Sequence, residues 1–147
     1  MGTMIDSNKV IISLDGVSNI KALKIANKLR GRVWGFKVND VLYRDINIIS
    51  RLKKFGRVFV DVKLHDIPNT VSNSVKRLSR LGADIITVHA SGGIEMMKMA
   101  KKNSGKSKII AVTVLTSNKS KSAGKEVLKL AKDALKAGVD GVVCSGH

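Results

Sequence analysis

The chain has 147 residues, of which 44% are hydrophobic, and a net charge of +16 from 27 basic and 11 acidic residues. This hydrophobic fraction excludes a disordered chain, and no apolar run approaches the roughly 18 residues of a membrane-spanning helix. The N-terminus lacks the basic head and apolar run of a signal peptide, and the single cysteine, Cys144, excludes a disulfide framework. We therefore expect one globular domain over residues 1–147, located in the cytoplasm.

The positive charge allows two interpretations. A basic chain can bind nucleic acid, but one Trp and one Tyr leave few rings to stack on bases. The lysines are also spread over every predicted helix rather than gathered in one run. We therefore favour a solvated lysine-rich surface, whose field would attract an anionic metabolite, and keep nucleic-acid binding as an alternative.

Short apolar segments alternate with helical patterns along the whole chain. The first segment, VIISLD at 10–15, has the β-branched residues of a buried strand, and a helix at 18–31 follows, with Ser18 as its N-cap and Gly31 as its stop. Further strands are predicted at 33–38, 57–64, 84–90, 108–116 and 139–145, and further helices at 41–56, 70–82, 93–105 and 123–138. Strands without polar alternation, separated by helices, indicate a parallel sheet.

Such a sheet could be doubly wound or part of an eight-stranded barrel. Polar residues stand at or just beyond the carboxyl ends of all six predicted strands: Asp15, Lys37, Asp61, Lys63, His89, Thr116 and Ser145. A barrel brings such residues together on one axis. The segment after the first strand also lacks the G-x-G-x-x-G spacing of a dinucleotide-binding loop. We predict an α/β fold of the (β/α)8 TIM-barrel type, with about six β/α units in this chain.

The third strand ends in an unusual cluster of charges. Asp61 and Lys63 are two residues apart and should face the same way, and Lys37 ends the neighbouring second strand. A Lys–Asp–Lys array would hold its groups ionised and oriented, which suits binding an anion and delivering a proton. The alternative is an ion pair that only stabilises the barrel.

Two histidines and a second acid lie near this cluster. Asp61, Asp66, His65 and His89 could be drawn as a metal site, but an ammonium group between the acids would compete with a cation. We therefore predict no metal. A structural role is favoured for His89, and His65 is expected in a loop beside a subunit contact.

The string DVKLHDIPNT resembles a known signature. Its D-x-K-x-x-D-I-x-x-T pattern, which places Asp61, Lys63, Asp66, Ile67 and Thr70, is similar to that of the orotidine 5′-phosphate decarboxylase family. The segments SLD, FKV, VHASGG, AVTVLTS and GVVCS resemble bacterial members in order and interval, so that the resemblance covers the chain from Val10 onward.

The resemblance implies a cofactor-free decarboxylation of orotidine 5′-phosphate to uridine 5′-phosphate in de novo pyrimidine biosynthesis. It implies that Asp61 lies against the substrate carboxylate and that Lys63 protonates the carbon that loses carbon dioxide. Lys37 would orient Asp61 and the ribose hydroxyls. Asp66 would act in the neighbouring subunit's site, which implies a homodimer with shared active sites.

The same resemblance implies further substrate contacts. Asp15 would bind the ribose, and Thr116 or Ser117 the pyrimidine edge. Ile67 and Thr70, which follow the third strand, join the substrate-binding set, with Thr70 reaching across the dimer. No metal or organic cofactor and no membrane is implied.

The C-terminal part of this family's pattern is missing, since the chain ends after the sixth predicted strand. The family's phosphate-binding loops follow strands seven and eight, so we expect either a fragment of a longer reading frame or a C-terminally truncated member, and in both cases a chain that is weakly active or inactive alone. Two alternatives remain: a metal-dependent sugar-acid phosphate decarboxylase of the same barrel superfamily, and a non-catalytic nucleic-acid-binding protein. The former places an acid on strand two, where this chain has Lys37.

Overall fold

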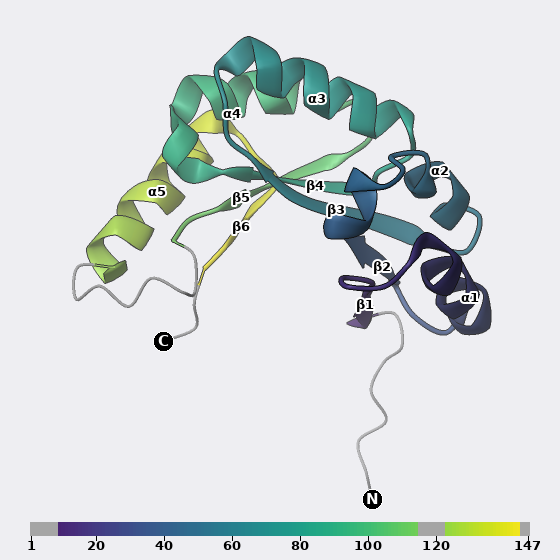
Figure 1. The fold of residues 1–147 in the computed structure, drawn as a ribbon. Helices are drawn as coiled ribbons and strands as arrows, with labels where there is room; N and C mark the ends of the chain where they lie inside the picture. The colour runs from purple at the N-terminus through teal and green to yellow at the C-terminus, as the bar shows by residue number, and fades with distance from the viewer. Residues whose placement is uncertain (1–8, 115–122, 145–147) are drawn as a thin grey trace, which may run out of the picture.

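The computed structural model describes residues 9–114 and 123–144, in which six parallel strands form one sheet (Figure 1). The strands are β1 (Ile11–Ser13), β2 (Gly35–Val38), β3 (Arg57–Leu64), β4 (Ile85–His89), β5 (Lys108–Val112) and β6 (Gly141–Val143). The helices are α1 (Asn19–Leu29), α2 (Ile48–Leu52), α3 (Pro68–Arg80), α4 (Gly93–Lys102) and α5 (Ala123–Ala137), with 3-10 turns η2 (Asp40–Tyr43) and η3 (Ala90–Gly92).

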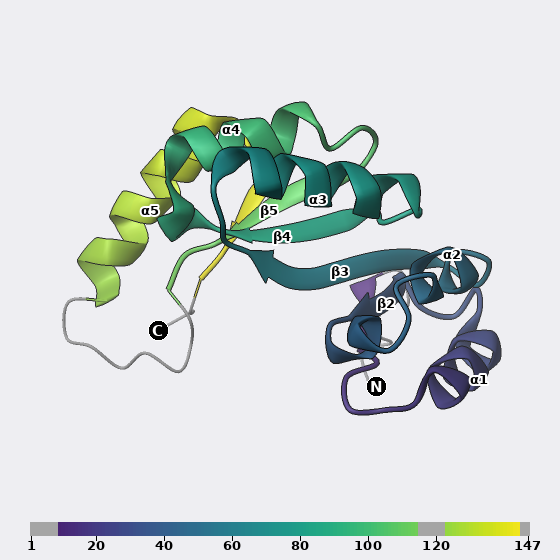
Figure 2. The same ribbon diagram turned by 45° about the horizontal axis from the view of Figure 1, so that its top comes forward.

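The strand order in space is the strand order in the sequence, β1 to β6. A doubly wound sheet reverses its order at a switch point, whereas a β/α barrel does not. Figures 1 and 2 show the helices along one side of the sheet, as in half of a barrel. The prediction of a barrel-type fold is confirmed, and the carboxyl ends of all described strands meet along one edge.

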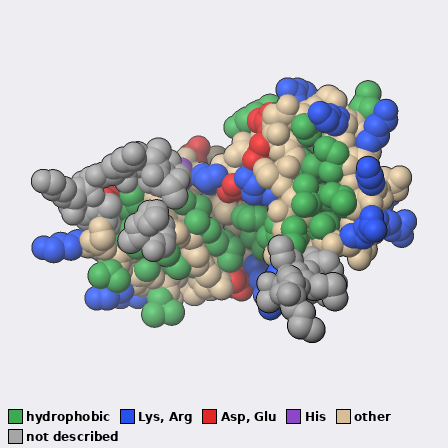
Figure 3. Space-filling view, turned by 90° about the horizontal axis from the view of Figure 1, so that it is seen from below, with side chains coloured by type: hydrophobic (Ala, Val, Ile, Leu, Met, Phe, Trp, Pro, Cys, Tyr) green, Lys and Arg blue, Asp and Glu red, His purple; other side chains and the backbone are tan. Residues whose placement is uncertain are grey.

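The core lies between the sheet and these helices. Phe36, Ile86 and Ile109 from the strands and Ile48 and Met97 from the helices are fully buried. Figure 3, which views the molecule from below, shows apolar side chains in two areas with charged side chains between them. No helix within the described ranges is long and apolar enough to cross a bilayer.

Two predicted helices differ from the structure. The segment 41–56 is not one helix, because η2 and α2 are separated by a turn in which the Asp45 side chain accepts a hydrogen bond from the backbone amide of Asn47 at 2.9 Å. Such side-chain bonding competes with helical hydrogen bonds. Helix α3 begins at Pro68, two residues before the predicted start, because proline needs no hydrogen-bond partner in the first turn. The predicted Ser18 cap is confirmed by its bond from the Lys21 amide.

Candidate active site

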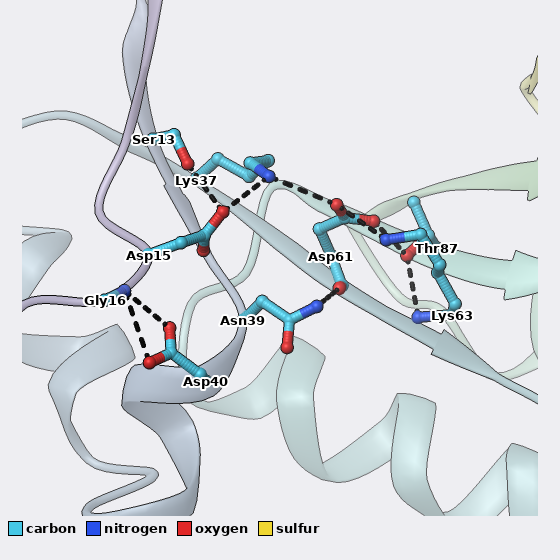
Figure 4. A network of polar contacts seen from close by, with 9 residues as sticks. All are labelled: Ser13, Asp15, Gly16, Lys37, Asn39, Asp40, Asp61, Lys63 and Thr87. Carbon is cyan, nitrogen blue, oxygen red and sulfur yellow. Dashed lines mark hydrogen bonds and ion pairs between the residues drawn. The ribbon is translucent and has the colours of Figure 1, made fainter. Parts of the chain in front are cut away.

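Four charged side chains alternate in sign across the carboxyl ends of the first three strands (Figure 4). The Lys37 ammonium nitrogen lies 2.8 Å from Asp15 Oδ2 and 3.4 Å from Asp61 Oδ2. The Lys63 ammonium nitrogen lies 2.9 Å from the same Asp61 oxygen. The predicted Lys–Asp–Lys array therefore exists, and Asp15 extends it by one acid. We call these four residues the charge array.

Asp61 is the most enclosed member of the charge array, with its side chain 13% exposed. Its second oxygen, Oδ1, accepts a 3.0 Å hydrogen bond from the hydroxyl of Thr87, which is fully buried on β4. The same hydroxyl oxygen accepts a 2.9 Å bond from the backbone amide of Lys63. Thr87 thus fixes the Asp61 carboxylate and the Lys63 backbone together.

The backbone that carries Asp61 and Lys63 is irregular. Val60 pairs with Ile86 and Leu64 with Val88, so β3 advances by four residues over the length in which β4 advances by two. Lys63 has a φ of 49°, a left-handed conformation that costs a non-glycine residue about 1–3 kcal/mol. Bulges of this kind redirect side chains and are common beside active sites. Asp61 and Lys63 do meet as predicted, but through a bulge and not through the alternation of a regular strand.

Two further contacts hold the surroundings of the charge array. The Asn39 side-chain amide donates a 2.7 Å bond to the backbone carbonyl of Asp61, inside the bulge. The Asp40 carboxylate accepts bonds of 3.0 and 3.2 Å from the backbone amide of Gly16, which ties the loop after β1 to the end of β2. Both contacts fix the positions of the strand ends that carry the charges.

The pairing changes the pKa values of two groups in the array. Partial burial would raise the pKa of Asp15, but hydrogen bonds from Lys37 and from the Ser13 hydroxyl outweigh it and lower that pKa. Partial burial would lower the pKa of Lys37, but the hydrogen bond to Asp15 and the charges of Asp15 and Asp61 raise it. Asp15 is therefore a carboxylate and Lys37 an ammonium at neutral pH.

The second half of the signature lies outside the charge array. Asp66, Ile67 and Thr70 are exposed, and Ile67 is 66% exposed. The Asp66 carboxylate accepts a 2.6 Å bond from the backbone amide of Ile67. An open depression of about 610 Å³ is lined here by His65, Asp66, Ile67, Pro68, Ser91 and Gly92. The signature is thus divided between a charge array and an exposed rim.

The two histidines lie together at this rim. The rings of His65 and His89 are 5.4 Å apart between centroids, with an angle of 45° between their planes. Partial burial, the neighbouring His65 and the charge of Lys63 all lower the pKa of His89. Within the described residues, no three His, Cys, Asp or Glu side chains are grouped to hold a metal ion.

Three residues of the site were not predicted from the sequence, and three predicted residues lie outside the part of the chain that the structure describes. Thr87, Asn39 and Asp40 were not predicted, although Thr87 is a polar residue within an apolar strand and the other two directly follow β2. The predicted base-binding residues Thr116 and Ser117 lie outside the described residues, as does the strand-end residue Ser145.

Fold and site together define a β/α-barrel protein with an ion-paired array at the carboxyl ends of its strands. A family model described as orotidine 5′-phosphate decarboxylase / HUMPS family matches residues 8–147. The chain belongs to this family.

Individual relatives agree with the family match. Orotidine 5′-phosphate decarboxylase from Streptococcus mutans is 49% identical over an alignment of 125 residues, and the match covers 76% of this chain and 54% of the relative. The Streptococcus pneumoniae enzyme is 50% identical over an alignment of 112 residues, and the match covers 68% of this chain and 48% of the relative. The chain therefore spans about half the length of the curated relatives it matches.

Solved structures show the same fold. The crystal structure of orotidine 5′-phosphate decarboxylase from Lactobacillus acidophilus matches with a TM-score of 0.83 and 38% identity, over 93% of this chain and 71% of that one. The enzyme from Pyrococcus horikoshii OT3 matches with a TM-score of 0.81 and 26% identity, over 93% of this chain and 67% of that one. These neighbours support the assignment to the β/α barrel.

Proposed function

We propose that this protein decarboxylates orotidine 5′-phosphate to uridine 5′-phosphate, a step of pyrimidine biosynthesis. The observation that carries the proposal is the Lys63–Asp61 ion pair of 2.9 Å at the end of β3, held by Thr87 and flanked by Lys37. The names of the relatives supply the substrate. The geometry of the charge array supports the decarboxylation chemistry.

The reaction breaks one carbon–carbon bond and forms one carbon–hydrogen bond. Carbon dioxide leaves, its bonding electron pair stays on the pyrimidine carbon, and a proton must reach that carbon. Lys63 is suited to both needs, because its ammonium group can stabilise the negative charge and then donate a proton. Asp61 orients the Lys63 ammonium group through their ion pair, and water afterwards returns a proton to the Lys63 amine.

Lys37 and Asp15 have positioning and binding roles in this proposal. Lys37 bridges Asp15 and Asp61, so it fixes the spacing between the carboxylate that binds ribose and the one beside the reacting group. An array in which each charge is already paired needs little rearrangement when the substrate binds. Thr116 or Ser117 would contact the base edge.

We also propose that the protein acts as a homodimer in the cytoplasm. Asp66, Ile67 and Thr70 are exposed beside a depression and form no part of their own chain's charge array. A twofold partner could place these residues against the other subunit's substrate, since a symmetric interface repeats the same contacts in both directions. A cytoplasmic location agrees with the single cysteine.

The decisive experiment measures carbon dioxide release from orotidine 5′-phosphate by the purified protein in a full-length context, in which the chain is extended to the length of its relatives, with and without a chelator. We expect turnover that EDTA leaves unchanged, because the Lys37 ammonium lies between Asp15 and Asp61, where a metal would need their oxygens. Loss of turnover in EDTA would favour the metal-dependent decarboxylase. A folded protein that releases no carbon dioxide and binds no orotidylate analogue would overturn the proposal.

A further inference from the structure

A second pocket lies at the opposite ends of the strands, away from the charge array. Its volume is about 280 Å³, and it is lined by Trp34, Arg57, Asp84, Ile85, Lys106 and Lys108. Trp34 precedes β2, Arg57 and Ile85 begin β3 and β4, and Lys108 begins β5. The proposed decarboxylation uses none of these residues.

The acids at this end of the sheet are already paired. Asp84 accepts bonds of 2.5 and 2.6 Å from Lys53 and a 2.8 Å bond from the backbone amide of Val58. Asp140 accepts two bonds of 2.7 Å from Lys101 and one of 2.8 Å from the amide of Ile109. Each acid thus joins the start of its strand to the preceding strand, and its charge is balanced by a lysine.

The cations of the pocket remain available. Arg57, Lys106 and Lys108 are exposed, and none of them forms a salt bridge within residues 9–114 and 123–144. The guanidinium carbon of Arg57 lies 5.3 Å from the centre of the Trp34 ring, a cation–π arrangement that holds the arginine at the pocket. Because the ion pair with Lys53 balances the charge of Asp84, the three cations give the lining a net positive charge.

We propose that this pocket binds a small, multiply charged phosphoryl compound of the nucleotide class. Arginine and lysine bind phosphoryl oxygens through charge-assisted bonds, and arginine can do so with two parallel bonds. Trp34 and Ile85 add an apolar wall suited to a flat ring. The volume of about 280 Å³ lies just below the range of about 300–1,000 Å³ for small-molecule sites, which favours a small metabolite over a polymer.

Trp34 makes the proposal directly measurable, because it is the single tryptophan of the chain. Its fluorescence should change when an anion draws Arg57 away from the ring. We expect inorganic pyrophosphate and ADP to change the emission in a saturable way that weakens with added salt. Adenosine, which lacks the phosphates, should have little effect.

Matched variants locate the binding. K106Q/K108Q removes two charges from the pocket and should weaken pyrophosphate binding at least about 10-fold. K132Q/K136Q removes the same charge from exposed positions of α5 and should leave the titration unchanged. Calorimetric titration of the same variants repeats the measurement without the fluorophore.

Three results would overturn the proposal. One is the absence of any response to millimolar pyrophosphate or ADP by either method. Another is equal weakening in both double variants, which would show a general field rather than a site. The third is tight binding of single-stranded oligonucleotides that grows with their length while ADP competes weakly, which would assign the surface to nucleic acid.

Discussion

The Thr87 hydroxyl on β4 donates a 3.0 Å hydrogen bond to Asp61 Oδ1 on β3, and both residues are buried. The Thr87 hydroxyl oxygen also accepts a hydrogen bond from the backbone amide of Lys63. One hydroxyl therefore serves as partner to a buried carboxylate and to a part-buried backbone amide at once. A residue of the same shape without the hydroxyl would leave both without this partner, with consequences for stability and for the charge array.

Replacing Thr87 with valine should therefore reduce both stability and turnover. The loss of a hydrogen-bond partner for a buried polar group costs about 1–3 kcal/mol. Without the Thr87 bond, the Asp61 carboxylate keeps its ion pairs with Lys37 and Lys63 but should shift in position, which should lower kcat more than it raises KM. Denaturant unfolding and steady-state kinetics of T87V measure the two effects.

Ser107→Ala is the matched control for this variant. Ser107 is also buried and donates a 2.6 Å bond to the carbonyl of Ala83, but it lies at the start of β5, away from the charge array. S107A should lose stability and keep its kcat. If T87V lost stability and kept a normal kcat, Thr87 would be a structural residue only.

Lys63→Ala should remove decarboxylation while the fold remains. Loss of a positioned acid–base group commonly costs about 100- to 10,000-fold in rate. The variant should fold, because the Lys63 side chain is 31% exposed and its truncation to alanine removes no contact of the hydrophobic core. Lys98→Ala on the exposed face of α4 provides a control with the same loss of charge. Turnover of K63A within a few-fold of the parent, both tested in the full-length context, would remove Lys63 from the mechanism.

The charges of the site were predictable from the sequence because they interrupt apolar strands. Asp61, Lys63 and Lys37 stand where a parallel sheet should be most hydrophobic, and the strand order places them at one edge of the sheet. The contact between Asp61 and Lys63 depends in addition on a bulge. The bulge was not predictable, because a lysine with positive φ gives no compositional signal of the kind that glycine gives. Thr87 was missed because threonine is also a common strand residue for reasons of shape.

The fold shows a similar division. The alternation of strands and helices predicted the barrel topology, which depends on patterns that span the whole chain. The interruption between η2 and α2 depends on one local competition, in which the Asp45 side chain bonds the Asn47 amide and also contacts Arg51. The apolar spacing of segment 41–56 cannot distinguish these two outcomes, because both place the same residues toward the core.

Asp140→Asn should make the free energy of unfolding less dependent on pH in the acidic range. Partial burial would raise the pKa of Asp140, but the bonds from Lys101 and from the Ile109 amide lower it. A carboxyl whose pKa is lowered by folding stabilises the protein above its ordinary pKa of about 3.9, and this stabilisation is lost as pH falls through the lowered value. The difference in unfolding free energy between the parent and D140N should therefore be largest at neutral pH and shrink below about pH 4.

Denaturant unfolding at a series of pH values measures this difference. Asp133→Asn on α5 is a control that removes an acid from an exposed i,i+4 pair with Lys129. Such pairs contribute little, so D133N should show a much smaller change. A pH-independent difference between the parent and D140N would show that Asp140 acts through its shape and not through its charge.

His89 should titrate at lower pH than an ordinary histidine. Burial lowers its pKa first, and the neighbouring His65 and Lys63 lower it further. The neutral ring is therefore favoured by folding, and the stability it contributes above about pH 6.5 is lost as pH falls through the lowered value. NMR titration, with the signal assigned by His89→Gln, should show this shift. Lys63→Ala should raise the pKa of His89 part of the way back, and an unchanged value would place Lys63 too far away to act.

Asp66 is expected to act in the site of a partner subunit. It extends from the exposed rim between β3 and α3, while Lys63 stays in the charge array of its own chain. Asp66→Asn and Lys63→Ala should each be nearly inactive alone. In a mixed dimer, one site has both defects and the other has neither, so a random mixture should recover up to about a quarter of the parent activity.

The mixing experiment requires proof that subunits exchange. Two different affinity tags on the variants allow the mixed dimer to be isolated, and its activity per dimer should approach half that of the parent. A mixture of Lys63→Ala with Asp61→Asn is the control, since both residues belong to the same array and neither mixed site would be complete. If the isolated mixed dimers of D66N and K63A recovered no activity, Asp66 would not act in the partner's site. It would then belong to the site of its own chain or take no part in the reaction.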